Sequence, residues 1–211
     1  MRELDIAALM CSKVCHDLIS PVGALANGLE VLSDDDDTEM RNEALALIDT
    51  SARAATAKLQ FARLAFGASQ SAGENVEMSM AEGLARGVFE TGKTALDWGF
   101  PAGPASKDRV RLMLNILVLA NDAIPRGGKL RVAPSEDGGP GGVDVTATGE
   151  RASVPEGFRF FETPVDSDGA DLDARSIQAF MAHLLARRLE ARIDAEARED
   201  SIVFRIRYAD A

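Results

Sequence analysis

The stretch CSKVCHDLISPVGALANGLEVL (residues 11–32) determines how the first part of the chain folds. Apolar and small residues recur in it at alternating steps of four and three, the spacing of a core-facing seam along one long helix. The same alternation returns over about residues 38–66, and Gly67 is a plausible end for that second helix. Because only the short polar turn SDDDDT joins the two, the sequence predicts an antiparallel helical hairpin over residues 1–70.

The apolar seam of the first helix also predicts how the hairpin assembles. It consists of Leu4, Ala8, Cys11, Cys15, Leu18, Val22, Leu25, Leu29 and Leu32. A lone hairpin leaves much of such a seam in water, whereas four helices close a core of this kind. We therefore expect two copies of the chain to form a dimeric four-helix bundle, with docking of the hairpin onto the rest of the chain as the alternative.

One polar residue of this helix, His16, is a candidate nucleophile. A helix turns about 100° per residue, so His16 points away from the seam and toward solvent although it follows Cys15 directly. The cysteines at positions 11 and 15 are expected to be small buried residues of the seam and therefore not to converge with His16 on a metal. Their spacing also differs from the haem attachment signal C-x-x-C-H.

The residues around His16 favour a catalytic role over that of a surface histidine without a function. Asp17 follows it, and Lys13 and Ser20 share its face of the helix. Pro21 interrupts the helical pattern and is expected to bend the helix just beyond the histidine. A neutral imidazole is a good nucleophile near pH 7, and an adjacent carboxylate can orient the ring or take up its proton. Taken alone, a surface histidine without a role stays the alternative.

The hexapeptide HDLISP (16–21) resembles the H-box of the dimerisation and histidine-phosphotransfer domain of two-component histidine kinases, usually H-E/D-L-x-x-P. The resemblance implies that His16 accepts a phosphoryl group and that Asp17 is its acidic partner. A partner protein is expected to dock on the helix faces between His16 and the hairpin turn. The candidates are Lys13, Ser20, Gly23, Ala24 and Asn27 on the first helix and Arg53, Thr56 and Lys58 on the second. Packing within the bundle is the alternative for the small residues Gly23, Ala24 and Gly28, and a solvated face is the alternative for Lys13 and Arg53.

Residues 76–211 have a different pattern and form a second predicted domain. A capping box beginning at Ser79 starts a helix to about residue 91, and further helices are expected over residues 106–124 and from Asp173 to about residue 190. The predicted strands cover residues 94–98, 129–133 and 142–148 and a closing hairpin over 190–208. Helices on one side of a mixed sheet make an α/β sandwich.

The segment NILVLANDAIPRGGKL (115–130) resembles the N-box of the Bergerat-type ATP-binding domain of histidine kinases. The positions in register are Asn115, Ala120, Pro125, Gly127 and Gly128. Leu119, however, stands where a second asparagine serves Mg²⁺ and phosphate, and leucine cannot coordinate a metal. Ala147 replaces the aspartate that reads adenine, and alanine cannot accept the hydrogen bond of the adenine amino group.

Two further departures concern glycines of the ATP site. Arg151 occupies the position of the second glycine in the motif that follows Ala147. No glycine lies between Gly169 and the end of the chain, so the later glycine loop is missing. Without it there is no backbone cradle for a triphosphate. The second domain therefore looks like a degenerate ATP-binding domain.

Together the two domains resemble ChpT-type histidine phosphotransferases, which pair a dimeric H-box bundle with a degenerate ATP-binding-like domain. The resemblance implies a phosphorelay within a cell-cycle pathway. A phosphoryl group would pass from the receiver domain of a CckA-like hybrid histidine kinase to His16, and then to aspartates of CtrA-like and CpdR-like response regulators. No ATP binding and no cofactor are expected, and Mg²⁺ is expected on the partner receiver domain.

Two alternatives from other classes remain open at this point. One is an ATP-dependent histidine kinase with a divergent nucleotide site. The other is a non-enzymatic interaction module that binds metal or haem through Cys11, Cys15 and His16.

Composition limits the function further. The 211 residues carry a net charge of −11, which disfavours a nucleic-acid partner. Hydrophobic residues make up 46% and charged residues 27%, as in globular proteins, and no apolar run approaches the roughly 20 residues of a membrane span. The start MRELDIAALM lacks the features of a secretion signal, and two cysteines make no disulfide framework. We therefore expect a cytoplasmic protein.

Overall fold

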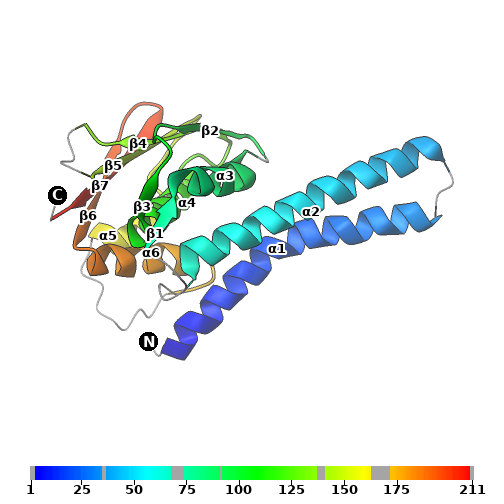
Figure 1. Cartoon of the computed structure of the whole chain (residues 1–211), viewed down its shortest axis with the longest axis horizontal. Helices are drawn as coiled ribbons and strands as arrows, with labels where there is room; N and C mark the ends of the chain where they lie inside the picture. Colours follow the sequence, from blue (N-terminus) through cyan, green and yellow to red (C-terminus); the bar gives the residue numbers. More distant parts are fainter. Residues whose placement is uncertain are drawn as a thin grey trace.

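The computed structural model shows a long helical hairpin attached to an α/β unit (Figure 1). It describes residues 3–34, 37–67, 74–90, 92–136, 141–162 and 172–209. Helices α1 (Glu3–Asp34) and α2 (Thr38–Phe66) run antiparallel and project well beyond the rest of the molecule (Figure 1). The Asp37 side chain caps α2 by accepting a hydrogen bond of 2.9 Å from the Glu39 amide, and Gly67 ends the helix as predicted.

Helix α1 bends part-way along its length, as the sequence predicts (Figure 1). Pro21 lies inside the helix and is buried. Its ring removes one backbone hydrogen bond and crowds the carbonyl of the preceding turn, which is the usual cause of such a bend. The bend therefore lies directly beyond His16.

The two helices pack closely at Gly28. A Cβ atom at this position would lie 2.7 Å from Cγ1 of Ile48 and 3.2 Å from the carbonyl oxygen of Ala44. At Gly23, by contrast, a Cβ atom would meet nothing within 4 Å. Gly28 therefore serves packing within the hairpin, whereas Gly23 leaves an open surface.

This difference gives a testable contrast. Gly28→Ala is expected to lower the free energy of unfolding by about 1 kcal/mol, because displacing Ile48 costs more than the roughly 1 kcal/mol gained in helix propensity. Gly23→Ala gains the propensity without the clash and is expected to raise that free energy by up to about 1 kcal/mol. Urea unfolding of both variants measures the two shifts. Shifts of the same sign and size would contradict the packing described here.

Within the described residues, the second unit contains a mixed sheet of five strands in the order β2-β4-β5-β7-β6. Its strands are β2 (Thr94–Trp98), β4 (Gly128–Pro134), β5 (Val143–Thr148), β6 (Ala191–Ala197) and β7 (Ser201–Tyr208). Only β2 and β4 pair in parallel, and the other neighbours are antiparallel. Strands β1 (Asn75–Glu77) and β3 (Pro104–Ser106) form a separate antiparallel pair.

Helices α3 (Met78–Phe89), α4 (Lys107–Asp122) and α6 (Ile177–Arg188) pack against this sheet (Figure 1). Burial alternates along β5, with Val143, Val145 and Ala147 buried between half-buried or exposed neighbours, as expected for a sheet covered on one face. A short 3₁₀ turn (Glu156–Phe158) and α5 (Arg159–Glu162) precede α6. The α/β sandwich predicted from the sequence is confirmed.

Two local predictions are wrong. The helix expected from a capping box at Ser79 begins at Met78, and its N-cap position is occupied by Glu77, which pairs with Pro104 in the β1–β3 ladder and makes no side-chain cap. Asp173 does not adjoin α6 but closes the turn before it, accepting hydrogen bonds from the amides of Arg175 and Ser176. These hydrogen bonds, chiefly those from Ser176, lower the pKa of the Asp173 carboxyl. Gly169 lies outside the described residues.

The hydrophobic core connects the hairpin to the second unit. Helix α4 lies at its centre, with Leu112, Leu114 and Ile116 fully buried. Phe61 from α2 joins this core and meets Phe89 of α3 edge to face, with ring centroids 5.8 Å apart. The base of the hairpin is thus docked on the second unit, while the rest of the hairpin is not. Among the described residues, no helix is long and apolar enough to cross a membrane.

Candidate functional site

His16 presents its imidazole to solvent, as its position on the helix predicts. Its side chain is 80% exposed, and Nδ1 lies 3.5 Å from Oδ1 of Asp17. At this distance the contact is loose, so Asp17 can orient the ring without enclosing it. The face of the ring remains open to an approaching protein.

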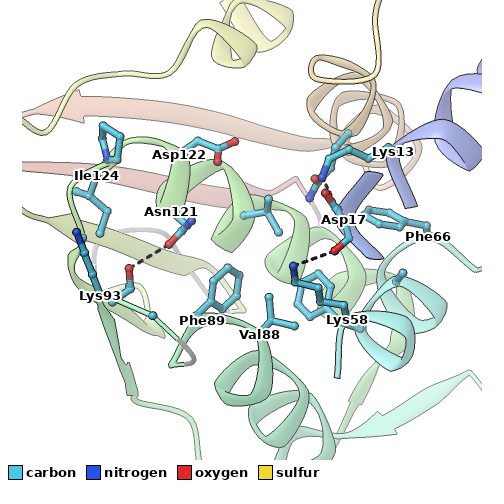
Figure 2. Close-up of a pocket in the computed structure, with 18 residues that line it drawn as sticks. Lys13, Asp17, Lys58, Phe66, Val88, Phe89, Lys93, Asn121, Asp122 and Ile124 are labelled. Atoms are coloured by element: carbon cyan, nitrogen blue, oxygen red, sulfur yellow. Dashed lines mark hydrogen bonds and ion pairs between the residues drawn. The ribbon is translucent and has the colours of Figure 1, made fainter. Parts of the chain in front are cut away.

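Two lysines hold Asp17 from different sides (Figure 2). Lys13, one turn earlier on α1, forms an ion pair with Oδ2 of the carboxylate. Lys58 of α2 donates a hydrogen bond of 2.9 Å from Nζ to the backbone carbonyl oxygen of Asp17. Both ammonium groups were predicted to face a partner protein, but in the structure both contact Asp17.

Asp122, at the end of α4, lies across a recess from Lys13 and Asp17 (Figure 2). Much of its surface is accessible, yet the protein atoms crowded around the carboxylate desolvate it and raise its pKa. The charge of Lys13 lowers that pKa by less, and the charge of Asp17 raises it further. Sequence reasoning missed this neighbour, since only the fold brings residue 122 to the H-box.

A second recess, of about 880 Å³, lies between His16 and the second unit. It includes Asn115 and Leu119 of α4, the positions at which the resemblance places the ATP site. Leu119 is buried and would lie 3.2 Å from a Cβ atom at Gly157, so it packs against the 3₁₀ turn that contains Gly157 and lines the recess. The position that holds the second asparagine of the kinase motif is therefore taken by an apolar side chain.

Asn115 is engaged elsewhere. Its side-chain amide donates hydrogen bonds to the carbonyl oxygens of Ala65 (3.1 Å) and Arg111 (2.8 Å). The first of these joins α4 to the last turn of α2. Ala147 is fully buried within β5, and Arg151 has a φ of 59°, a left-handed conformation that glycine adopts most easily. The turn has thus kept a glycine-like backbone although the glycine is gone.

Comparisons with known proteins agree with this geometry. The sequence profile of the family described as "Histidine phosphotransferase C-terminal domain" matches residues 78–201. The "Protein phosphotransferase ChpT" of Brucella abortus (strain 2308) is 41% identical over 205 residues, which cover 97% of this chain and 96% of that protein. The chain belongs to the histidine phosphotransferase family.

One solved structure gives the same result for the fold. A structure of a bacterial phosphotransferase superposes with a TM-score of 0.83 at 37% identity, covering 98% of this chain and 97% of that one. The histidine kinase AdeS of Acinetobacter baumannii aligns over 93% of this chain, with 13% identity and a TM-score of 0.41. The phosphotransferase is thus similar to this chain over both of its parts.

In the present chain, itself a histidine phosphotransferase, most of the predicted docking residues lie on accessible surface. Ser20, Gly23, Asn27 and Thr56 are exposed, and Ala24 is half-buried. Arg53 is 79% exposed and pairs with Asp49 along α2 at 2.8 Å, a hydrogen bond that lowers the pKa of the Asp49 carboxyl. Their role in docking stays a prediction.

The predicted burial of the two cysteines is wrong for a single chain. Cys11 and Cys15 are free and exposed, because α2 packs on the side of α1 that carries Pro21 and Gly28. Hydrogen bonding to Cys11 raises the pKa of the Cys15 thiol. Within the described residues, no group of three or more His, Cys, Asp or Glu side chains is arranged to hold a metal ion.

Proposed function

We propose that this phosphotransferase is a cytoplasmic phosphorelay intermediate that carries the phosphoryl group on His16. The observation that supports the proposal best is the 80% exposed imidazole beside an aspartate that Lys13 and Lys58 hold in place. A relay needs only such an accessible nucleophile and a surface on which a receiver domain can dock, because transfer depends mainly on positioning.

In this mechanism Nε2 of a neutral His16 attacks the phosphorus of an aspartyl phosphate on the receiver. The new N–P bond forms as the P–O bond to the aspartate breaks, and the aspartate leaves as a carboxylate. The proton remains on Nδ1, which faces Asp17 at 3.5 Å, so the carboxylate stabilises the positive charge that develops on the ring. Transfer to a downstream aspartate is the reverse reaction on a second receiver. The Mg²⁺ that assists both steps is expected in the receiver's acidic pocket.

The proposed partners are the receiver domain of a hybrid histidine kinase upstream and response regulators downstream. The proteins expected from the resemblance are the CckA-like kinase and the CtrA-like and CpdR-like regulators of a cell-cycle relay. Their docking surface would lie between His16 and the hairpin turn, on exposed residues of both helices. These residues are Ser20, Gly23 and Asn27 on α1 and Thr56 on α2. Arg53 would add a positive charge to that surface.

We also propose that the chain carries out no ATP-dependent reaction. Leu119 fills the position of a metal-binding asparagine, and the amide of Asn115 is bonded to Ala65 and Arg111. Ala147 offers no acceptor for adenine. We expect titration calorimetry with ATP and Mg²⁺ to give no binding heat, and incubation with γ-labelled ATP to leave the chain unlabelled. Label from ATP would favour the divergent kinase instead.

Dimerisation through the hairpin is the remaining part of the proposal. Several large apolar side chains are exposed on the two helices of a single chain, among them Val22 (52%), Leu29 (57%), Leu45 (53%) and Leu59 (50%). Val22 and Leu29 are one heptad apart on α1, and Leu45 and Leu59 are two heptads apart on α2, so each pair fits the repeat of a coiled-coil seam. Pairing two hairpins would cover this stripe and form a four-helix bundle with two accessible histidines.

A reconstituted relay tests the proposal as a whole. A receiver domain labelled on its aspartate is mixed with the purified chain, and a second receiver is then added. We expect label to appear on the chain within the first step and to leave it for the second receiver. A chain that takes label only from ATP, or from neither source, would refute the relay.

A further inference from the structure

Pro21 leaves one backbone carbonyl of α1 without its helical partner. In an α-helix the amide of each residue donates to the carbonyl four residues earlier, so residue 21 would serve the carbonyl of Asp17. Proline has no amide hydrogen, and its ring pushes that carbonyl away from the helix axis. The acceptor that is released belongs to the residue directly after His16.

Lys58 supplies the missing donor from the other helix. Its Nζ lies 2.9 Å from the carbonyl oxygen of Asp17, a contact between residues 41 positions apart (Figure 2). Lys58 is half-buried, and its stem crosses the interface between α1 and α2. Hydrogen bonds from a charged donor are stronger than those between neutral groups, and more so where water is partly excluded.

We infer that Lys58 is a positioning residue that fixes the bend of α1 and thereby the direction of the His16 imidazole. Lys13 holds the side chain of Asp17, and Lys58 holds its backbone, so together they fix both parts of the residue that contacts Nδ1. The inference rests on the proposed role of His16 as the phosphoryl acceptor. It differs from the expectation that Lys58 binds the receiver directly.

The two roles make different predictions in a Pro21→Ala background. There the amide of residue 21 can donate to the Asp17 carbonyl itself, which makes the lysine redundant. If Lys58 acts by positioning, replacing it must therefore have a smaller effect when Pro21 is also replaced. A direct contact with the receiver would be independent of residue 21.

The test is a double-mutant cycle with Lys58→Met and Pro21→Ala, followed by transfer of label from a phosphorylated receiver. Lys58→Met is expected to lower the maximal transfer rate about tenfold with KM changed less than about twofold, since the nucleophile is misaligned but the surface is kept. In the Pro21→Ala background the same substitution is expected to change the rate less than about twofold. Lys58→Arg, which keeps a charged donor, should restore most of the rate.

Two controls make the outcome decisive. Arg53→Met removes another long cation of α2, one that pairs with Asp49, and its effect should be the same with either residue at position 21. Amide hydrogen exchange over residues 16–22 should quicken in Lys58→Met but not in the double variant. Equal effects of Lys58→Met in both backgrounds, a change in KM alone, or unchanged exchange would overturn the inference. If the wild-type chain accepts no label, the relay proposal fails, while the exchange result still decides whether Lys58 stabilises the bend.

Discussion

His16→Ala is expected to abolish phosphoryl acceptance, lowering the transfer rate by at least about 10³-fold. The N–P bond cannot form without the imidazole, and Asp17 is held by Lys13 in an ion pair that disfavours its use as a substitute nucleophile. Because the His16 side chain is 80% exposed, its removal should leave the unfolding midpoint unchanged. Initial rates with a labelled receiver, together with a thermal melt, measure both effects.

The other histidine of the chain provides the matched control. His183 is half-buried on α6, with its ring 5.8 Å from that of Phe161 and 6.4 Å from that of Phe180. Burial lowers the pKa of its imidazole, and no part of the mechanism uses it. His183→Ala should cost about 1 kcal/mol of stability and leave the transfer rate within about threefold. A His16→Ala protein that still accepts label would refute the assignment.

Leu29→Glu is expected to dissociate the proposed dimer, raising its dissociation constant by about 10² to 10³-fold. Leu29 lies in the exposed stripe that pairing would cover, and two-fold symmetry places two new carboxylates in each interface. Burying an unpaired charge costs several kcal/mol, so the interface should not tolerate the pair. Sedimentation equilibrium of the wild-type and variant chains gives the two constants.

Met80→Glu is a closely matched control for this experiment. Met80 is an apolar residue of α3 with the same exposure as Leu29, 57%, but it lies outside the hairpin. The variant should remain dimeric. A monomeric wild-type chain, or a Leu29→Glu chain that still pairs with wild-type affinity, would contradict the proposed assembly.

Much of the hairpin could be predicted because its signals are local. The alternating apolar steps predicted two helices, and α2 begins at Thr38 and ends before Gly67, as expected. The rotation of a helix per residue placed His16 on the exposed face. The longer strands were likewise recognisable from alternating apolar and polar residues. Strands β1 and β3, of three residues each, are too short to show any period.

The features that could not be predicted depend on contacts between distant segments. The seam of α1 was expected to be closed by a four-helix bundle, and within a single chain α2 covers its Leu18 and Leu25 side and leaves Val22 and Cys15 exposed. No local pattern indicates which neighbour each seam residue will meet. The hydrogen bond from Lys58 to Asp17 spans 41 residues and cannot be inferred from helix periodicity.

The second domain shows the same limitation in a different form. Sequence reasoning identified Leu119 and Ala147 as residues that cannot serve ATP. It did not identify what the retained Asn115 does, because the acceptor of its amide, the carbonyl of Ala65, lies 50 residues away. In this structure that asparagine joins α4 to the last turn of α2, so it helps to anchor the hairpin on which His16 lies.

The position of the phosphoryl group shows whether His16 is the residue that carries it. The chain is incubated with Mg²⁺ and either a receiver labelled on aspartate or labelled ATP, and the acid-labile, alkali-stable label is then mapped to a peptide at neutral or alkaline pH. We expect phosphate on His16 in the receiver sample and none in the ATP sample. Phosphate on His183, or on His16 from ATP, would contradict a relay through His16.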